Sequence, residues 1–350
     1  DGNYSLTATA TDAAGNTSNT SSALSINIDA TAPSAPTSLT TSATTTNDNT
    51  PIITGTAEAG STVKLFNGST LLGSATAASN GAFSITSSTL SVGNYSLTAT
   101  ATDAAGNISS ASIPLSVTIQ SHVFNTRAEL DNAINAWITD EAAATSTYGD
   151  INTWDVSRIE NFSQLFKNKA TFNSDISNWD VSSGNNFAYM FYGAMSFNQN
   201  IGNWDVSSGN IFSHMFHSAY SFNQNLNNWD VGNGTNFNEL FAAAQKFNGD
   251  ISNWDMSSAT TAALMFNGAI LFNQDIGNWD VSNISSFYGL FNGAKSFNQD
   301  ISQWDVSSGF DFNEMFDGAQ TFNQDISQWD MSSGVTFHRM MDSAFAFNQD

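Results

Sequence analysis

The chain of 350 residues contains no cysteine, and it has only four histidines and eight basic residues. The lack of cysteine excludes disulfide bonds, thiol catalysis and thiolate zinc sites. The few histidines leave little material for acid–base catalysis. No apolar run approaches the length of about 20 residues that a membrane-spanning helix needs. The composition therefore predicts a protein that is not an enzyme and does not insert this segment into a membrane.

Acidic residues outnumber basic ones by 31 to eight, which gives a formal net charge of -23. A chain of this charge is repelled by phosphate backbones and by anionic lipid. We therefore expect it to bind neither nucleic acid nor membrane surfaces. Hydrophobic residues make up 40% of the chain, which is enough to build a packed core.

Internal repetition divides the chain, and the first repeat is all-β in character. The stretch that begins at Gly2 recurs letter for letter at Gly93 and reads GNYSLTATATDAAGN. We therefore interpret residues 1–29 as the C-terminal part of a truncated domain and residues 30–119 as a complete copy. Short alternating strands are expected at 52–57, 63–66, 71–77, 82–86, 95–102 and 113–119. This pattern, with turns at Asn67-Gly68 and Asn80-Gly81, predicts a β-sandwich.

The second repeat has a period of 25 residues and is marked by tryptophan. The repeated tryptophans are Trp154, Trp179, Trp204, Trp229, Trp254, Trp279, Trp304 and Trp329. Within one unit, apolar residues recur at helical spacing: Phe187, Met190, Phe191, Ala194 and Phe197. Ile176, Trp179 and Val181 have the spacing of a short strand in a leucine-rich repeat. Residues 151–350 are therefore predicted to form an α/β solenoid of the leucine-rich-repeat type, with about eight 25-residue coils.

Residues 120–150 connect the two systems and carry the signals of a helix. Thr126 and Glu129 form a capping box, and Leu130, Ile134 and Trp137 follow on one face. An amphipathic helix at this place would cover the first coil of the solenoid. Because the chain begins inside one repeat and stops inside another, we also expect it to be a segment of a longer protein.

Two resemblances to known families follow from these motifs. The units that read WDVSS…F..MF..A..FNQDI resemble the BspA-type leucine-rich surface proteins of bacteria, the DUF285 repeat family. Residues 30–119 are similar to bacterial Ig-like domains of large secreted adhesins, through the stretches GTAEAGSTV and TATDAAGN. Both resemblances imply a bacterial cell-surface or secreted location and a role in adhesion. Neither implies a particular ligand.

Three loop acids suggest a calcium site in the complete sandwich. Asp29 lies in the linker, Glu58 in the turn between the strands expected at 52–57 and 63–66, and Asp103 in the last hairpin loop. In a seven-stranded sandwich these places lie at the same end, and converging carboxylates suit Ca²⁺. We expect Asp12 to take the role of Asp103 in the truncated copy. The alternative is that all four are exposed loop acids.

One aspartate follows every repeated tryptophan and forms a column on the predicted solenoid. The column consists of Asp155, Asp180, Asp205, Asp230, Asp255, Asp280, Asp305 and Asp330. Strands stacked about 4.8 Å apart would place these charges close enough to repel by roughly 1 kcal/mol per neighbouring pair in water. Hydrogen bonds within a turn could offset this repulsion, as could bound cations or a basic partner. The column is therefore either a structural feature or a binding face.

The other recurring or chemically notable residues are interpreted as structural. An asparagine column is expected to form hydrogen bonds along the solenoid axis: Asn173, Asn198, Asn223, Asn248, Asn273, Asn298, Asn323 and Asn348. His214 and His217 occur in one repeat only, so we interpret them as surface histidines. The motifs of serine hydrolases, phosphate-binding loops, zinc proteases and dinucleotide-binding folds are all absent from the sequence.

These features predict a stalk of Ig-like domains that presents a solenoid for binding an extracellular glycan or protein. The alternative is a structural protein that associates with itself into an extracellular filament or surface layer. A polysaccharide-degrading solenoid is disfavoured, because identical carboxylates in every coil provide no acid and base of different pKa.

Overall fold

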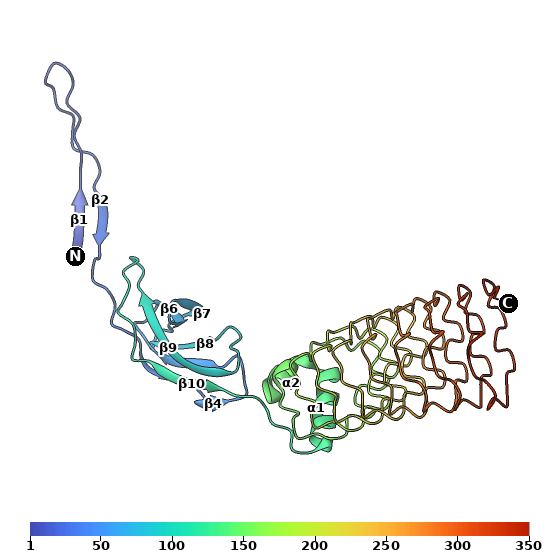
Figure 1. Cartoon of the computed structure of the whole chain (residues 1–350). Coiled ribbons are helices and arrows are strands. Elements are labelled where there is room, and N and C mark those ends of the chain that lie inside the picture. The colour runs from blue at the N-terminus through green and yellow to red at the C-terminus, as the bar shows by residue number, and fades with distance from the viewer. Residues whose placement is uncertain (350) are drawn as a thin grey trace. The chain divides into compact units, whose positions relative to one another are not determined.

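The computed structural model describes residues 1–349, which form two compact units divided after Gln120. The first unit contains all the strands found within residues 1–349 (Figure 1). Its strands are β1 (Gly2–Leu6), β2 (Leu24–Ile28), β3 (Thr37–Thr40), β4 (Thr45–Thr46), β5 (Ile52–Thr56), β6 (Thr62–Asn67), β7 (Thr70–Thr76), β8 (Ala82–Thr86), β9 (Gly93–Thr102) and β10 (Leu115–Ile119).

Residues from β3 to β10 confirm the predicted β-sandwich. One sheet has the strand order β4-β10-β9-β6-β7 and the other has the order β3-β5-β8. All pairs are antiparallel except β10 with β4. Alternate apolar residues of both sheets share one core, which includes Ile53, Leu65, Phe83, Leu97 and Val117.

The sandwich differs from the prediction in two details. The short strands β3 and β4 were not expected, because their Thr- and Ser-rich sequence has no apolar alternation. Asn67-Gly68 does close the β6–β7 hairpin, with Gly68 at a φ of 58°. Asn80-Gly81 does not close a hairpin, because β7 and β8 belong to different sheets.

The β1–β2 hairpin repeats β9–β10 in conformation as well as in sequence. Gly2 pairs with Ile28 as Gly93 pairs with Ile119, and the intervening register is the same. Leu6 is nevertheless 51% exposed, whereas its counterpart Leu97 is fully buried. The hairpin therefore follows from local sequence, while burial of its apolar face depends on the other strands of a sandwich.

Two helices and a short 3₁₀ turn open the second unit: α1 (Arg127–Thr139), α2 (Glu141–Tyr148) and η1 (Ile151–Thr153). The capping box of Thr126 and Glu129 is present at the start of α1. Trp137 and Ile134 are buried against the first coil, and the Trp137 ring lies edge-on to Trp154 at 5.8 Å. The predicted covering helix is thus confirmed, and α2 adds a second one.

Arg127 of α1 also satisfies exposed backbone of the first coil. Its guanidinium donates hydrogen bonds to the backbone oxygens of Asn161 (2.7 Å) and Ser163 (2.8 Å). In later coils the equivalent oxygens accept N–H groups from the preceding coil, as Ile211 O accepts from Phe187 N. The first coil has no preceding coil, so α1 supplies the missing donors.

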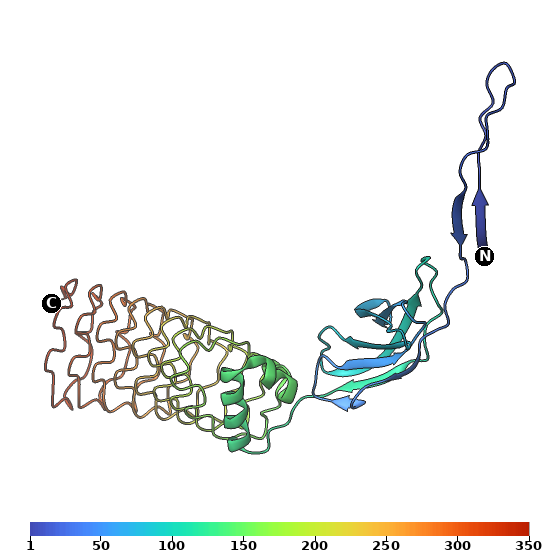
Figure 2. The same cartoon turned by 180° about the vertical axis from the view of Figure 1, so that it is seen from behind.

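From Trp154 onward, each 25-residue repeat forms one coil stacked on the next (Figures 1 and 2). The predicted helix in each repeat is wrong, because turns occupy this stretch in all described coils. In 187–194, Met190 N and Tyr192 N bond to oxygens three residues earlier, and Phe191 N bonds to Met215 O of the next coil. Tyr189 and Gly193 have positive φ angles of 59° and 65°, which interrupt any helix.

The predicted strand at each tryptophan is also wrong. Trp179 N bonds to Ile176 O and Gly184 N bonds to Val181 O, so this segment consists of turns. The pairing between coils consists of isolated parallel bridges elsewhere, for example Asn161 with Asn186. The coils are therefore a stack of turns and isolated bridges rather than an α/β structure.

Aromatic columns form the core of the coils, as the repeat predicts. Rings 25 residues apart stack nearly parallel, as in Phe166 on Phe191 with centroids 5.3 Å apart and Trp229 on Trp254 at 6.3 Å. Each tryptophan from Trp179 to Trp329 donates its Nε1–H to a backbone oxygen 28 residues earlier, at 2.7–3.2 Å. The indoles therefore join neighbouring coils through both packing and hydrogen bonds.

Candidate binding face of the coils

The predicted calcium ligands lie in neighbouring loops of the first unit, but their carboxylates do not form a cluster. Asn107 Nδ2 donates to the backbone oxygen of Asp29 at 3.1 Å, which places the linker beside the β9–β10 loop. Glu58 lines a cavity together with linker residues Ser34 and Ala35. Within residues 1–349, no three acidic or histidine side chains are grouped so that they could hold a metal.

The structure gives Asp103 and Asp12 a role within their own loops. Asp103 accepts hydrogen bonds from Ala105 N and from both Asn107 N and Asn107 Nδ2, all at 2.9 Å. These hydrogen bonds, above all the one from the Asn107 side chain, lower the pKa of Asp103. Asp12 makes the equivalent bonds in the β1–β2 loop. A calcium site here would need further backbone or amide ligands, and it stays a prediction.

The aspartate column lies on the surface, where each member holds its own turn together. Seven of the eight aspartates are exposed and Asp155 is half-buried. Every one accepts the N–H of the residue two positions later, at 2.9–3.1 Å. At Asp205 the Ser207 hydroxyl adds a bond of 2.6 Å, and these bonds lower the pKa of Asp205. The carboxylates therefore act as turn acceptors, as one of the two alternatives predicted.

The asparagine column forms a ladder from coil to coil. Asn198 N donates to Asn173 Oδ1 at 2.9 Å, and the same bond recurs in every later coil up to Asn348 at 2.8–2.9 Å. Neighbouring glutamines add bonds to the same asparagines, as Gln224 Nε2 does to Asn198 O. The predicted structural role of this column is confirmed.

The coils differ from one another mostly in one half of the repeat, and the sequence interpretation missed this. With each tryptophan as position 0, position 1 is Asp and position 19 is Asn in all eight repeats. Between positions 6 and 17, by contrast, every residue outside the core varies, with seven residue types at position 10 and six at position 13. Alignment of the eight repeats against one another would have found this contrast.

Positions 10 and 13 form two adjacent columns that we call the variable strip. Position 10 holds Gln164, Tyr189, His214, Glu239, Leu264, Gly289, Glu314 and Arg339. Position 13 holds Lys167, Tyr192, His217, Ala242, Asn267, Asn292, Asp317 and Asp342. Most of these residues are half-buried.

Aromatic rings and charges meet in the first part of the strip. Tyr189 stacks on His214 with centroids 4.3 Å apart, and Tyr192 stacks on His217 at 4.6 Å. The Lys167 ammonium lies over both tyrosine rings, 4.7 and 5.5 Å from their centroids. The Glu239 carboxylate lies 3.2 Å from His214 Nε2 and 2.9 Å from His217 Nδ1.

The sequence suggested that the two histidines are surface residues, but the structure places them in a cluster of rings and charges. Their side chains are about one-fifth exposed, and the Nδ1 atom of each is buried without a well-aligned hydrogen bond. Burial lowers the pKa of His214, and the carboxylate of Glu239 partly offsets this effect. Desolvation thus favours the neutral imidazole of His214 at neutral pH.

The last part of the strip is acidic and contains one arginine. Arg339 contacts Asp317 at 2.8 Å and Asp342 at 3.0 Å. Asn292 donates to Glu314 at 2.9 Å in the neighbouring coils. The strip therefore changes from aromatic and basic to acidic along its length.

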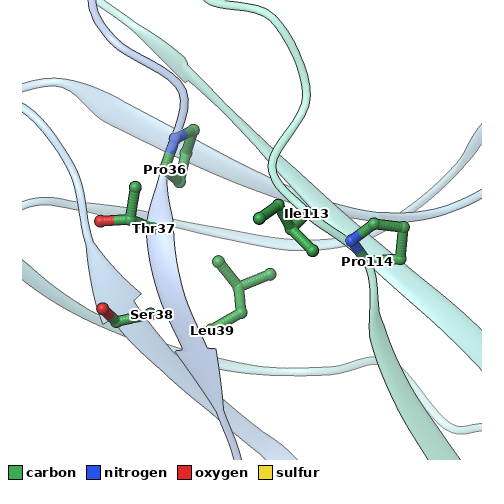
Figure 3. Close-up of a pocket in the computed structure, with 6 residues that line it drawn as sticks. All are labelled: Pro36, Thr37, Ser38, Leu39, Ile113 and Pro114. Atoms are coloured by element: carbon green, nitrogen blue, oxygen red, sulfur yellow. The ribbon is translucent and has the colours of Figure 1, made fainter.

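Two cavities lie away from this strip. A cavity of about 250 Å³ in the sandwich lies between β3 and the segment before β10, with Leu39 and Ile113 at its centre (Figure 3). A second one, of about 340 Å³, lies beside the start of α1 and is lined by His122, Glu129 and Tyr148. The first has no charged lining residue. No helix within residues 1–349 has the length and apolar character needed to cross a membrane.

Comparison with known families agrees with this division of the chain. The family model described as bacterial Ig-like domain matches residues 32–121. The model described as Mycoplasma protein of unknown function, DUF285, matches residues 141–254 and 235–350, which together are more than half of the chain. No curated protein matches the chain. The chain therefore belongs to the DUF285 family and carries a bacterial Ig-like domain before its DUF285 repeats.

Proposed function

We propose that this chain is part of a bacterial cell-surface protein whose coils bind a partner outside the cell. Membership of the DUF285 family together with an Ig-like domain supports the surface location. The Ig-like unit would serve as a stalk. In this proposal residues 151–350 form a solenoid of the leucine-rich-repeat type, in which turns replace the helix of each repeat.

One observation carries the binding role: variation between the coils is concentrated in positions 6–17, whereas positions elsewhere in the repeat vary among only a few residue types. Stacking alone requires only that the core residues and the hydrogen-bond ladders repeat. A filament that is built from identical contacts would likewise need only a uniform surface on every coil. Residues that differ from coil to coil on one face instead suit a partner that is itself irregular, and repeat proteins present such surfaces for recognition.

The proposed activity is binding rather than catalysis. The exposed carboxylates repeat in the same turn environment from coil to coil, for example at Asp205 and Asp280. Paired acid–base chemistry needs two carboxylates in different environments, so that their pKa values differ.

The test is binding of the whole chain to glycan and protein arrays, with calcium and with a chelator. We expect saturable binding to a subset of probes. The variant Lys167→Gln/Tyr192→Ala/Glu314→Gln, in the variable strip, should lose this binding. The matched variant Asp180→Asn/Asp280→Asn lies at position 1, in the half of the repeat outside positions 6–17, which we call the constant half. This variant should keep the binding.

Three outcomes would contradict parts of this proposal. Loss of binding only in the constant-half variant would move the site away from positions 6–17. Loss of binding only with chelator would point to cation-dependent recognition by the aspartate column. Absence of binding by the folded chain, together with filaments in electron micrographs, would favour the structural alternative.

A further inference from the structure

We propose that the first part of the variable strip binds the carboxylate groups of an acidic polysaccharide. The residues concerned are Lys167, Tyr189, Tyr192, His214 and His217. This inference rests on the proposed binding function, and it names the site and the chemical class of the partner.

A basic group is available at one end of this site. The Lys167 ammonium contacts the faces of Tyr189 and Tyr192. A cation held over aromatic rings keeps its charge and can still donate hydrogen bonds to an anion. Only six basic residues occur in 151–350, so a lysine in this position is a selective feature of an acidic surface.

The ring stacking favours a sugar over a protein as the partner. Protein interfaces depend on aromatic or aliphatic anchors that become desolvated in a pocket of the partner. Here the faces of Tyr189 and Tyr192 are already covered by the histidine rings and by Lys167. What remains for contact is mainly polar: the Lys167 ammonium and the phenol hydroxyls, which suit the hydroxyl and carboxylate groups of a polysaccharide.

The arrangement along the stack favours a polymer. The lysine, the tyrosine pair and the histidine pair come from three successive coils. A chain of sugars that lies along the strip would meet a new set of polar groups at every coil. Several weak contacts of this kind on one ligand combine into higher avidity.

Glu239 sets the charge of the site and gives it a pH dependence. Its carboxylate faces both histidines and would repel a ligand carboxylate while the imidazoles are neutral. The other groups that face the histidines are Tyr189, Tyr192 and, one coil further away, Lys167. Protonation of His214 below neutral pH would partly neutralise Glu239 and add positive charge, so carboxylate binding should tighten as the pH falls.

The test uses the whole chain and three polymers: polygalacturonate, polysialic acid and neutral dextran. We expect binding of at least one of the two acidic polymers and none of dextran. Lys167→Gln should weaken this binding about tenfold or more, whereas Lys64→Gln, at an exposed position of the first unit, should not. Tyr189→Phe/Tyr192→Phe, which removes only the hydroxyls, should weaken it, and Tyr4→Phe, also in the first unit, should not.

Two further measurements protect the test against misfolded variants. Glu239→Gln should bind the acidic polymer several-fold more tightly at pH 7.5, whereas Glu141→Gln, at an exposed position of α2, should be unchanged, and damaged folding would not produce such a gain. Binding should tighten between about pH 7.5 and pH 5.5, and His214→Gln should reduce this dependence.

The results separate this inference from the broader function. Equal binding of dextran, or acidic-polymer binding that none of the strip variants alters, overturns the carboxylate site but leaves a binding function. Binding to array proteins without any binding to the polymers would likewise overturn the carboxylate site and leave a binding function. Absence of binding to polymers and arrays alike overturns both proposals.

Discussion

At the scale of single residues, the coils show that an acceptor oxygen matters more than a negative charge. Position 21 of the repeat is Asp in most coils but Asn at Asn200 and Asn225. Asn200 Oδ1 accepts Gly202 N at 3.0 Å, and Asp275 Oδ1 accepts Gly277 N at the same distance. Either side chain therefore closes the same turn, and the charge is not required for it.

The same reasoning gives a prediction for the aspartate column. Asp205→Asn should leave the free energy of unfolding nearly unchanged, because the amide oxygen can still accept Ser207 N. Asp205→Ala should lower it by about 1 kcal/mol, because the turn loses its acceptor. Urea unfolding of the two variants would check this. Equal losses in both would show that the carboxylate charge itself is needed.

His214 provides a prediction for pH. Burial lowers its pKa in the folded chain below the ordinary value of 6.5. The unfolded chain then binds the proton more readily, so stability should fall as the pH drops below about 6.5 and level off below the folded-state pKa. Melting temperatures measured between pH 7.5 and pH 5 should decline less for His214→Gln than for the wild type. The exposed His338→Gln is the control, and an unchanged slope in the His214 variant would contradict the prediction.

At the scale of the structural element, the shape of each coil depends on residues in the left-handed backbone conformation, which the apolar pattern of the sequence does not reveal. Consecutive turns place Phe187, Met190 and Phe191 in the core with the spacing of a helix face. Local sequence therefore cannot distinguish the two backbones by apolar periodicity alone. The turns prevail because N–H groups such as Phe187 N find acceptors in the next coil, which an isolated repeat does not have.

Position 14 of the repeat tests the cost of this conformation. Ala243 has a φ of 55° and Gly268, in the next coil, a φ of 66°. A side chain at Gly268 would meet no atom closer than 3.6 Å, so any penalty comes from the backbone. Gly268→Ala should lower the free energy of unfolding by about 1 kcal/mol, and Ala243→Gly should raise it by a similar or smaller amount. Denaturant titration would measure both changes. A Gly268→Ala variant with the same free energy of unfolding as the wild type would argue against a left-handed conformation at this position.

At the scale of the whole molecule, the net charge of -23 works against the compact state. The aspartate column places one carboxylate in every coil, and mutual repulsion among these groups is screened by salt. The core columns and hydrogen-bond ladders hold the coils together against this repulsion.

Salt should therefore stabilise the protein. We expect the melting temperature to rise between about 10 mM and 500 mM NaCl, because the Debye length shrinks from roughly 30 Å to a few ångströms. Calorimetry at several salt concentrations would measure the shift. Replacing Asp180, Asp230 and Asp280 together by Asn should reduce it, and a shift that is unaffected would place the repulsion elsewhere.

Several features of this protein follow from sequence alone. The two repeat periods predicted the division of the chain, and alternation predicted the sandwich strands from β5 to β10. The capping box predicted α1, and the asparagine column predicted its ladder. Each of these depends on contacts nearby in the chain or on identical residues one period apart, so a local pattern is sufficient to reveal it.

Tertiary structure decided the rest, because it supplies partners that no local pattern contains. It replaced the expected helix of each coil by turns that bond to the next coil, and it left the carboxylates of Asp29, Glu58 and Asp103 without a common centre. It also brought Lys167 and Glu239, 72 residues apart in number, to the two ends of one cluster of stacked rings. Stacking turns a distance of 25 residues into direct contact, and only then do the variable positions become one surface.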